Sequence, residues 1–199
     1  MASEIQTLQG LDTLAYVRLL KNASKEDGQL IPYQTSLTFD PQRDSDSTAT
    51  KSGNVATTSS LETDFEVEFI NNISKVSDDL YESLLENEKV EAWIVNRKRI
   101  NSEGKYFAWY MRGTVTEDEN DNDADDASTR DATFTIDGTP QRGWLELPDA
   151  AKEELAYVFR GIGKVDKATD DGTDGGGQPW DTEQDRGQGA DEKPVASNA

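Results

Sequence analysis

The eighteen residues from Arg43 to Ser60 read RDSDSTATKSGNVATTSS, and their single sizeable apolar side chain is Val55. The segments on either side, residues 29–39 and 61–70, carry the apolar and β-branched residues typical of strands. A polar loop this long is uncommon inside a compact domain and is usually either functional or disordered. The chain is therefore expected to fold as a β structure that tolerates a long polar excursion between two strands.

The segment after the excursion has the clearest strand pattern. Phe65, Val67 and Phe69 alternate with Glu66 and Glu68, so one face of the strand is apolar and the other is charged. This alternation predicts a strand with one side in the core and the other in water.

One clear helix is predicted, in SDDLYESLLENEK at residues 77–89. Ser77 is its candidate N-cap, and two aspartates follow in the first turn, where the helix dipole favours negative charge. Apolar side chains recur at four-residue spacing, in the pairs Leu80, Leu84 and Tyr81, Leu85.

Most of the remaining body reads as β structure. Segments with strand character occupy residues 13–21, 90–100, 105–115, 132–136 and 143–147. Turn residues predict hairpins that join the first segment to residues 29–39 and the second segment to the third. In residues 105–115 both alternating sets of side chains are largely apolar, so this strand is predicted to be covered on both faces. A short helix at 147–155 and a last strand at 156–163 complete a fold that is mainly β with one clear α-helix.

The composition divides the chain into three parts. Residues 1–12 are polar with isolated apolar positions and are expected to form an N-terminal arm. Residues 13–165 form the ordered body, which includes the long loop 43–60. Residues 166–199 are rich in glycine and hold nine acidic and three basic residues, so this acidic tail is expected to be disordered.

The charge of the chain limits its partners. Forty acidic and twenty basic residues give a formal net charge of -20, which should repel nucleic acid and anionic membrane surfaces. The first thirty residues lack a basic start followed by an apolar core, and no apolar run is long enough to span a bilayer. A soluble protein with no membrane partner is therefore expected.

The chain contains neither cysteine nor histidine. These absences exclude thiolate and imidazole metal ligands, Ser-His-Asp triads and Cys-His pairs. The remaining carboxylates and lysines show no catalytic spacing. We therefore predict no enzymatic activity, no catalytic residues and no cofactor.

The run EDENDNDADD at residues 117–126 holds seven carboxylates and no cation. The one-three-five spacing of a calcium-binding EF-hand loop is met by Asp118, Asn120 and Asn122. The diagnostic glycine at position six is replaced by Asp123, and the glutamate at position twelve is replaced by Thr129. The run is therefore interpreted as a solvated loop between strands, and no metal site is predicted.

The polar excursion and its flanks, PYQTSLTFDPQRDSDSTATKSGNVATTSSLETDFEVEF at residues 32–69, resemble the N-terminal half of the major tail proteins of long, flexible-tailed bacteriophages. The shared features are a strand ending in QT, a Ser/Asp-rich stretch, then T-K-x-G and a second strand. The resemblance continues through DDLYESLLENEKVEAWIV, the aromatic strand ending MRGTVTE, and TFTIDGTPQRGWLEL. It covers about residues 10–165.

The resemblance implies a β-sandwich or partial barrel flanked by a helix, similar in fold to type VI secretion tube proteins. It implies a virion protein, made in the cytoplasm of the bacterial host, whose copies form hexameric rings stacked into a tail tube. The implied partners are further copies, the tape measure protein, and the tail terminator or baseplate proteins. Double-stranded DNA would pass through the tube as non-specific cargo.

Two sets of candidate contact residues follow from this resemblance. A long polar hairpin that orders only against a neighbouring copy is the expected contact between rings or subunits, through Asp44, Asp46, Thr50, Lys51, Gly53, Asn54 and Val55. A basic lumen would hold DNA at its phosphates, whereas an acidic lumen lets it slide. The candidate lumen or acidic-surface residues are Glu66, Glu68, Glu117, Asp118 and Glu119.

Two alternatives of other classes remain open at this stage. The net charge also suits an acidic DNA mimic that inhibits a DNA-binding enzyme, although such a protein needs neither the two-faced aromatic strand nor the T-K-x-G hairpin. The tryptophans suggest a glycan-binding β-sandwich. Packing in a core or between subunits is the simpler interpretation of these aromatic residues, because they lie in strands whose alternation buries them.

Overall fold

The structure, a computed structural model, describes residues 7–148, 162–163, 180–181 and 186. All the elements below lie in the first of two compact units, Met1–Ala151, and the second unit is Lys152–Ala199. The helix expected at 147–155, the last strand and the acidic tail fall outside the described residues apart from those few positions. The domain boundaries drawn from the sequence therefore stay predictions.

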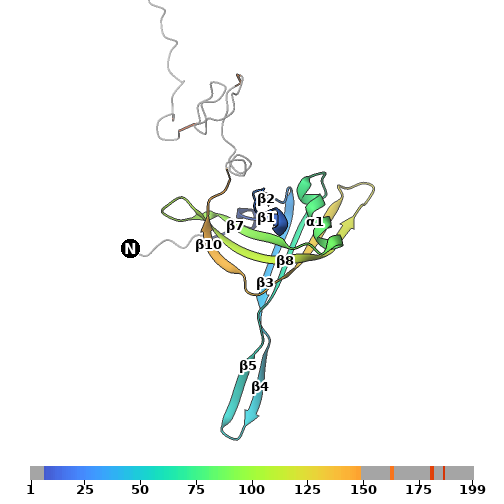
Figure 1. The fold of residues 1–199 in the computed structure, drawn as a ribbon. Coiled ribbons are helices and arrows are strands. Elements are labelled where there is room, and N and C mark those ends of the chain that lie inside the picture. Colours follow the sequence, from blue (N-terminus) through green and yellow to red (C-terminus); the bar gives the residue numbers. More distant parts are fainter. Residues whose placement is uncertain (1–6, 149–161, 164–179, 182–185, 187–199) are drawn as a thin grey trace, which may run out of the picture. The chain divides into compact units, whose positions relative to one another are not determined.

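The described residues form ten strands and one α-helix (Figure 1). In chain order the elements are β1 (Thr13–Leu19), β2 (Gln29–Leu30), β3 (Gln34–Gln42), β4 (Ser45–Thr50), β5 (Gly53–Thr58), β6 (Glu62–Ile70), α1 (Lys75–Glu86), β7 (Val90–Ile100), β8 (Tyr106–Asp121), β9 (Thr129–Ile136) and β10 (Gln141–Leu145). Short 3₁₀ turns at Gly10–Asp12 and Leu20–Asn22 precede and follow β1.

Eight of these strands form one antiparallel sheet in the order β2-β1-β7-β8-β9-β6-β3, with β10 also paired to β8. The sixteen-residue β8 lies in the middle of the sheet and pairs with three other strands. One edge of β8 pairs with β7, while the other pairs first with β10, up to Tyr110, and then with β9, from Gly113 onward. Strands β4 and β5 form a separate two-stranded sheet.

The two ends of the large sheet meet, so that it curls into a partial barrel. The side-chain oxygen of Gln34 on β3 accepts the Ala15 N–H of β1 at 2.8 Å, and its amide nitrogen donates to the Ala15 carbonyl at 2.9 Å. The Ile31 N–H donates to the same carbonyl at 3.1 Å. A glutamine side chain thus replaces strand pairing between β1 and β3. The predicted fold class, mainly β with a flanking helix, is confirmed.

The apolar core lies inside the curl and beneath α1. Phe65, Val67 and Phe69 are fully buried there, and the Phe65 ring packs on Phe134 of β9 with 4.8 Å between ring centroids. Because side chains alternate along a strand, the glutamates between them point to the outside of the sheet. The alternation in β6 therefore predicts the core correctly.

The helix exists as predicted but begins earlier. Its N-cap is Ser74, whose hydroxyl oxygen accepts the Ser77 N–H at 3.2 Å, whereas Ser77 lies buried within the first turn. The prediction of Ser77 as the cap was wrong. Ser74 and Ser77 both stand before the apolar repeat of the helix, so the sequence alone did not distinguish them. At the other end Asn87 adopts φ 56°, the left-handed conformation that ends many helices. No helix in the described part of the chain has the length and apolar character needed to cross a bilayer.

Three strand predictions need correction. Residues 29–39 are two strands, because the chain turns at Ile31 to Tyr33, where Tyr33 has φ 56°. Strand β3 then pairs with β6, which is distant in sequence, rather than with β1. The acidic run, expected as a loop, remains in β8 as far as Asp121. The long loop 43–60 holds the paired strands β4 and β5, which form the polar hairpin expected from the resemblance.

The prediction that β8 is covered on both faces is confirmed. On the core side Trp109 packs against Phe39, with 5.0 Å between ring centroids. On the opposite side Tyr110 packs against Trp93 at 5.7 Å and donates a hydrogen bond of 2.6 Å to Glu91. Aromatic rings on both faces hold β8 in the middle of the fold.

A buried ion pair connects α1 to the sheet. The Arg130 guanidinium forms a two-point contact with the Asp118 carboxylate, and their side chains are 1% and 0% exposed. Arg130 also donates to the Ser77 carbonyl of α1 at 3.2 Å and lies 3.8 Å from the Tyr81 ring centroid. Residues from α1, β8 and β9 therefore meet at one cation.

Replacing this cation should be strongly destabilising. We expect Arg130→Met to lower the free energy of unfolding by about 3–5 kcal/mol, because it leaves the Asp118 carboxylate buried without a partner. Chemical denaturation followed by circular dichroism measures this loss. Lys89→Met is the matched control: it breaks the exposed Lys89–Asp137 pair and should change stability by less than about 1 kcal/mol. Equal losses in the two variants would contradict the structural role of Arg130.

Candidate functional site

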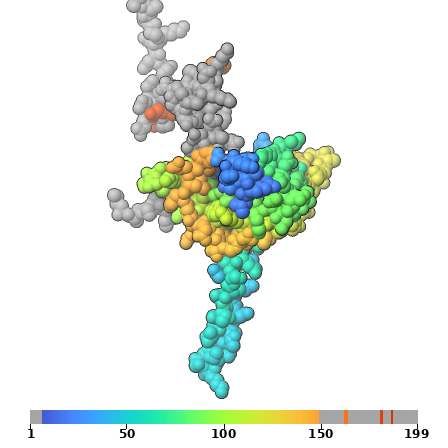
Figure 2. Space-filling view, viewed as in Figure 1, coloured from blue at the N-terminus to red at the C-terminus, as the bar shows by residue number. Residues whose placement is uncertain are grey.

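Strands β4 and β5 form a polar arm, residues 43–60, that continues the β3–β6 ribbon. The ribbon pairs as far as Gln42 and Glu62, and the Ser59 N–H then donates to the Asp44 carbonyl at 2.8 Å. Every residue of β4 and β5 is exposed, and Figure 2 shows the arm in cyan with open space around it. A two-stranded hairpin without a core is marginally stable by itself. The arm is therefore a surface element available to a partner.

The arm gathers all the contact residues predicted from the polar excursion. Its tip is a two-residue turn between Thr50 and Gly53, where the Thr50 hydroxyl donates to the Gly53 carbonyl at 2.6 Å and Gly53 has φ 133°. Val55 is 54% exposed and faces Thr48 across the ladder. The polar arm thus holds all seven candidate contact residues, Asp44, Asp46, Thr50, Lys51, Gly53, Asn54 and Val55. Their role in contacts between copies stays a prediction.

The predicted acidic residues also share a surface, apart from Asp118. Registers across β3, β6, β9 and β8 place Glu66 beside Thr133, Glu68 beside Asp131, and Asp131 beside Glu119. We call the outward side of these strands the acidic face. Its carboxylates are Asp40, Glu62, Asp64, Glu66, Glu68, Glu117, Glu119, Asp121 and Asp131.

No cation interrupts this face within the four strand segments. Strands β3, β6, β9 and the part of β8 from Gly113 carry ten acidic residues but only one basic residue, Arg130. Arg130 points inward and is 1% exposed. Serine, threonine and glutamine fill most of the remaining outward positions of these strands, and Ile70 at the end of β6 is apolar. Its negative charge is neutralised by no side chain of its own strands.

The expectation that Asp118 belongs to this surface was wrong. A register shift between Val115 and Glu117 turns Asp118 inward, where Arg130 holds its carboxylate. Asn120, the next position of the apparent EF-hand spacing, accepts a hydrogen bond of 3.1 Å from the Tyr81 hydroxyl. These residues are thus committed to packing, and among the described residues no group of three or more acidic side chains is arranged to hold a metal ion.

Asp131 belongs to the acidic face but was missed from the sequence. One of its carboxylate oxygens is buried and has no hydrogen-bond donor among the described residues. Burial, together with the neighbouring Glu66 and Asp118 carboxylates, raises the pKa of Asp131 to about 6. The signal was present in TRDATFTI, where Asp131 shares the outward alternation of Thr129 and Thr133. The raised pKa reflects the burial of this carboxyl group first and the neighbouring carboxylates second.

Comparison with known proteins defines the family. A family model described as phage tail tube protein matches residues 7–142, which include the helix and the strands β1 to β9 and end within β10. The chain therefore belongs to the phage tail tube protein family. It is a structural component of a phage tail, and members of this family assemble into tail tubes. A search of curated proteins finds no match.

Solved structures with little sequence similarity share the fold. The tail tube of SPP1 is 14% identical, with a TM-score of 0.61 over 82% of this chain and 92% of that chain. The tail of an empty gene transfer agent particle, which has C6 symmetry, is 8% identical, with a TM-score of 0.54 over 69% of this chain and 99% of that chain. The tube-terminating cap of the anti-feeding prophage is 14% identical, with a TM-score of 0.51 over 72% and 96% of the two chains.

The acidic face makes the stability of the subunit depend on pH. The folded pKa of Asp131, about 6, exceeds the ordinary 3.8, so the folded chain retains a proton that the unfolded chain releases between these values. Stability from this group is present below pH 3.8 and is lost as the pH rises through about 6. We expect Asp131→Asn to raise the thermal midpoint at pH 7 by up to about 4 °C, and this gain should shrink as the pH falls.

Thermal unfolding between about pH 4 and pH 7 followed by circular dichroism measures the effect. Glu119→Gln removes the same charge from an exposed position of the acidic face and serves as the control. A gain at Asp131 that is independent of pH, or that Glu119→Gln reproduces, would show that net charge rather than the burial of Asp131 is responsible.

Proposed function

We propose that six copies of this chain close into a ring and that stacked rings form the tail tube through which double-stranded DNA leaves the capsid. The observation that carries the proposal is the acidic face, a sheet surface made by β3, β6, β9 and the part of β8 from Gly113, which together have no exposed cation. A ring of six is supported by the C6 symmetry of the gene transfer agent tail, which shares the fold. A closed ring also removes the free edges of the sheet, which are a hazard in a single subunit.

In this proposal the acidic face lines the lumen. DNA carries about one negative charge per 1.7 Å of its axis, so a basic wall would bind it at many phosphates and stop it. A wall of carboxylates repels the phosphates and keeps the duplex away from the surface. We assign this repulsion of the DNA phosphates to Glu66, Glu68, Glu117, Glu119 and Asp131.

The polar arm then connects one ring to the next. Because β4 and β5 are exposed along their whole length, the polar arm contributes little to the subunit core and is free to pack on another copy. At the tube ends we propose contacts with terminator or baseplate proteins, and along the lumen with the tape measure protein. The chain acts without catalysis or cofactor and is made in the host cytoplasm. The alternative of a DNA mimic has no observation in its favour.

Removing the polar arm should separate folding from assembly. We expect a variant that lacks Ser45–Thr58, with Asp44 and Ser59 joined by an Asn-Gly turn, to unfold within about 2 °C of the wild type. It should form no long tubes, because the contact between rings is lost. Negative-stain electron microscopy measures tube length, and thermal unfolding is the control for folding. Long tubes from the armless chain would rule out the role of the arm in stacking.

Assembly should also depend on salt. Each subunit carries a formal charge of -20, so six carry 6 × -20 = -120, and rings that approach one another repel. Salt screens charges beyond about 8 Å at physiological ionic strength. We therefore expect more tube mass, measured by sedimentation, in about 0.5 M NaCl than in dilute buffer. Equal yields in the two buffers would show that net repulsion does not limit stacking.

A further inference from the structure

The subunit also carries a cationic surface at the opposite end of β8 from the acidic run. We call it the Arg–aromatic patch, and its members are Arg99, Phe107, Trp109, Arg142 and Trp144. They come from β7, β8 and β10; Lys98 and Lys105, which lie near them in sequence, are paired with Asp12 and with Glu103 and Glu146. In a chain with twice as many acidic as basic residues, this grouping of cations requires an explanation.

The geometry of the patch depends on a bulge in β7. The pairing with β8 shifts between Asn96 and Ile100, so residues 97–99 have no partners in the ladder. The buried Asn96 side chain accepts the N–H groups of Lys98 and Arg99 at 3.1 and 3.0 Å, which fixes the bulge. The Arg99 guanidinium then lies 3.9 Å from the Phe107 ring centroid. The cation is therefore held in place by the backbone and by an aromatic ring.

The patch has the composition of a protein contact. Trp144 is 46% exposed and meets Phe107 edge-on at 5.7 Å, while Arg142 lies 5.6 Å from the Trp109 centroid. Tryptophan and arginine dominate the energetically important positions of protein interfaces. An arginine stacked on a ring still presents its N–H groups to a carboxylate. Among the described residues, neither Arg99 nor Arg142 has a carboxylate within 4.0 Å, whereas Lys98 is paired with Asp12.

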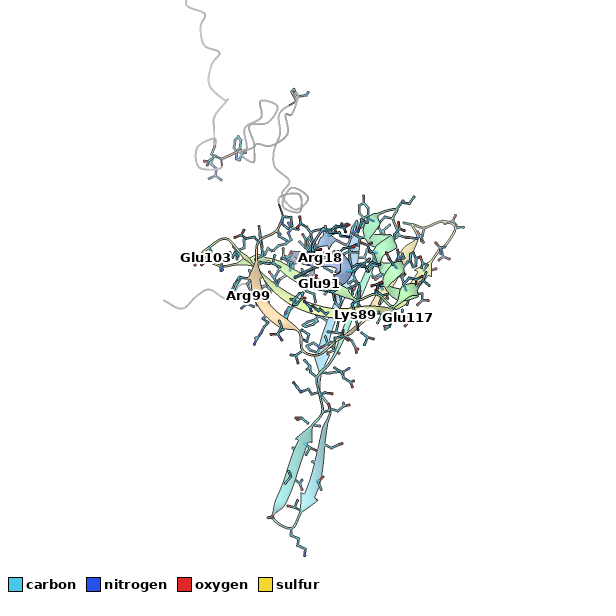
Figure 3. The ribbon with its side chains drawn as sticks, in the orientation of Figure 1. Arg18, Lys89, Glu91, Arg99, Glu103 and Glu117 are labelled. Atoms are coloured by element: carbon cyan, nitrogen blue, oxygen red, sulfur yellow. The ribbon has the colours of Figure 1, made fainter. Side chains whose placement is uncertain are left out.

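The complementary surface lies on the same chain but out of reach. The loop DNDADD, residues 121–126, which we call the acidic loop, begins where β8 ends and has four exposed acidic residues and no cation. The eleven residues 110–120 of β8 separate it from the patch, a path along the strand of roughly 40 Å at about 3.3 Å per residue. Figure 3 shows Arg99 and Glu117 toward opposite ends of β8. This separation greatly exceeds the screening length of about 8 Å, so the two surfaces cannot satisfy each other within one subunit.

We infer that the Arg–aromatic patch of one copy binds the acidic loop of the next copy in a head-to-tail contact. Two unlike surfaces on one chain form a heterologous contact, and such contacts generate rings when the rotation between copies closes. This inference rests on the proposed ring and names the surfaces that hold it together. The contact is short-range and backed by aromatic rings, so salt screens it less than it screens the repulsion between whole rings.

Charge reversal of each surface provides the test. The patch variant carries Arg99→Glu and Arg142→Glu, and the loop variant carries Asp123→Lys, Asp125→Lys and Asp126→Lys. Each variant places like charges together in the proposed contact. Each variant alone should form at least about tenfold less tube than the wild type, since like charges placed together oppose binding. A mixture of the two in equal amounts should recover tubes, because alternating copies restore every opposite-charge contact and an even-numbered ring closes.

Lys25→Glu is the control for charge reversal, because Lys25 is an exposed cation outside both surfaces. This control variant should assemble normally. Thermal unfolding checks that each subunit folds. If Arg99→Glu with Arg142→Glu does not fold, Arg99→Gln with Arg142→Gln replaces it, and this variant should still reduce assembly. Negative-stain microscopy and sedimentation measure tube formation.

Four outcomes would overturn the inference. Normal assembly of the folded patch variant would remove the patch from the ring contact and leave the tail-tube function intact. Failure of the mixture to recover tubes would show that the acidic loop is not the partner. Binding of a single-stranded oligonucleotide that is lost in the patch variant while tubes form normally would make the patch a nucleic-acid site. If the wild type itself formed no rings or tubes, the proposed function would fall and this contact with it.

Discussion

The two-residue alternation of β6 and β9 determines both the core and the surface of this subunit. Phe65, Val67 and Phe69 fill the inside of the curled sheet, and the same pleat necessarily places Glu66 and Glu68 outside. A slip of one residue in register would bury two carboxylates and expose three large apolar side chains. The penalty for such a slip is large, so the strand pairing is well defined. The acidic face is therefore a direct consequence of the way the core is specified.

The inside of the sheet also contains one buried carboxylate, that of Asp118, whose charge must be neutralised there. The bulge between Val115 and Glu117 turns Asp118 into the interior, and Arg130 neutralises it there while also holding the helix. The single cation of β3, β6, β9 and the part of β8 from Gly113 is thereby used inside the fold. None remains to neutralise the outside, which explains how one surface reaches so high a density of negative charge.

Local patterns in the sequence predicted much of the fold. The strand β7 has the expected limits, β6 has the expected buried face, and the two apolar sets of β8 correctly indicate that both of its faces are covered. These features depend on neighbours two to four residues apart, which the sequence displays. The pairing of β3 with β6 and the closure by Gln34 depend on contacts between distant residues, so local periodicity did not reveal them.

The candidate site was predictable to a similar extent. The polarity of residues 43–60 indicated a surface element and the resemblance implied a hairpin, but the limits of β4 and β5 were not predicted because no apolar alternation marks them. Acidic residues were recognised by type, whereas the inward turn of Asp118 came from a bulge that has no local signature. The Arg–aromatic patch was missed because its members come from three strands that are brought together only by the fold.

The completed core and the exposed assembly elements together explain how such a subunit can be stable alone and still associate. Its apolar side chains are buried within the curled sheet, so folding does not wait for a partner. The polar arm and the Arg–aromatic patch present polar and charged groups that another copy can contact, while the acidic face presents carboxylates that no cation of its own strand segments neutralises. Opposite charges at the two ends of β8 allow the Arg–aromatic patch of one copy to meet the acidic loop of another, whereas a patch that met a patch would place arginine against arginine. The head-to-tail repetition of this contact is the arrangement that we propose for the ring.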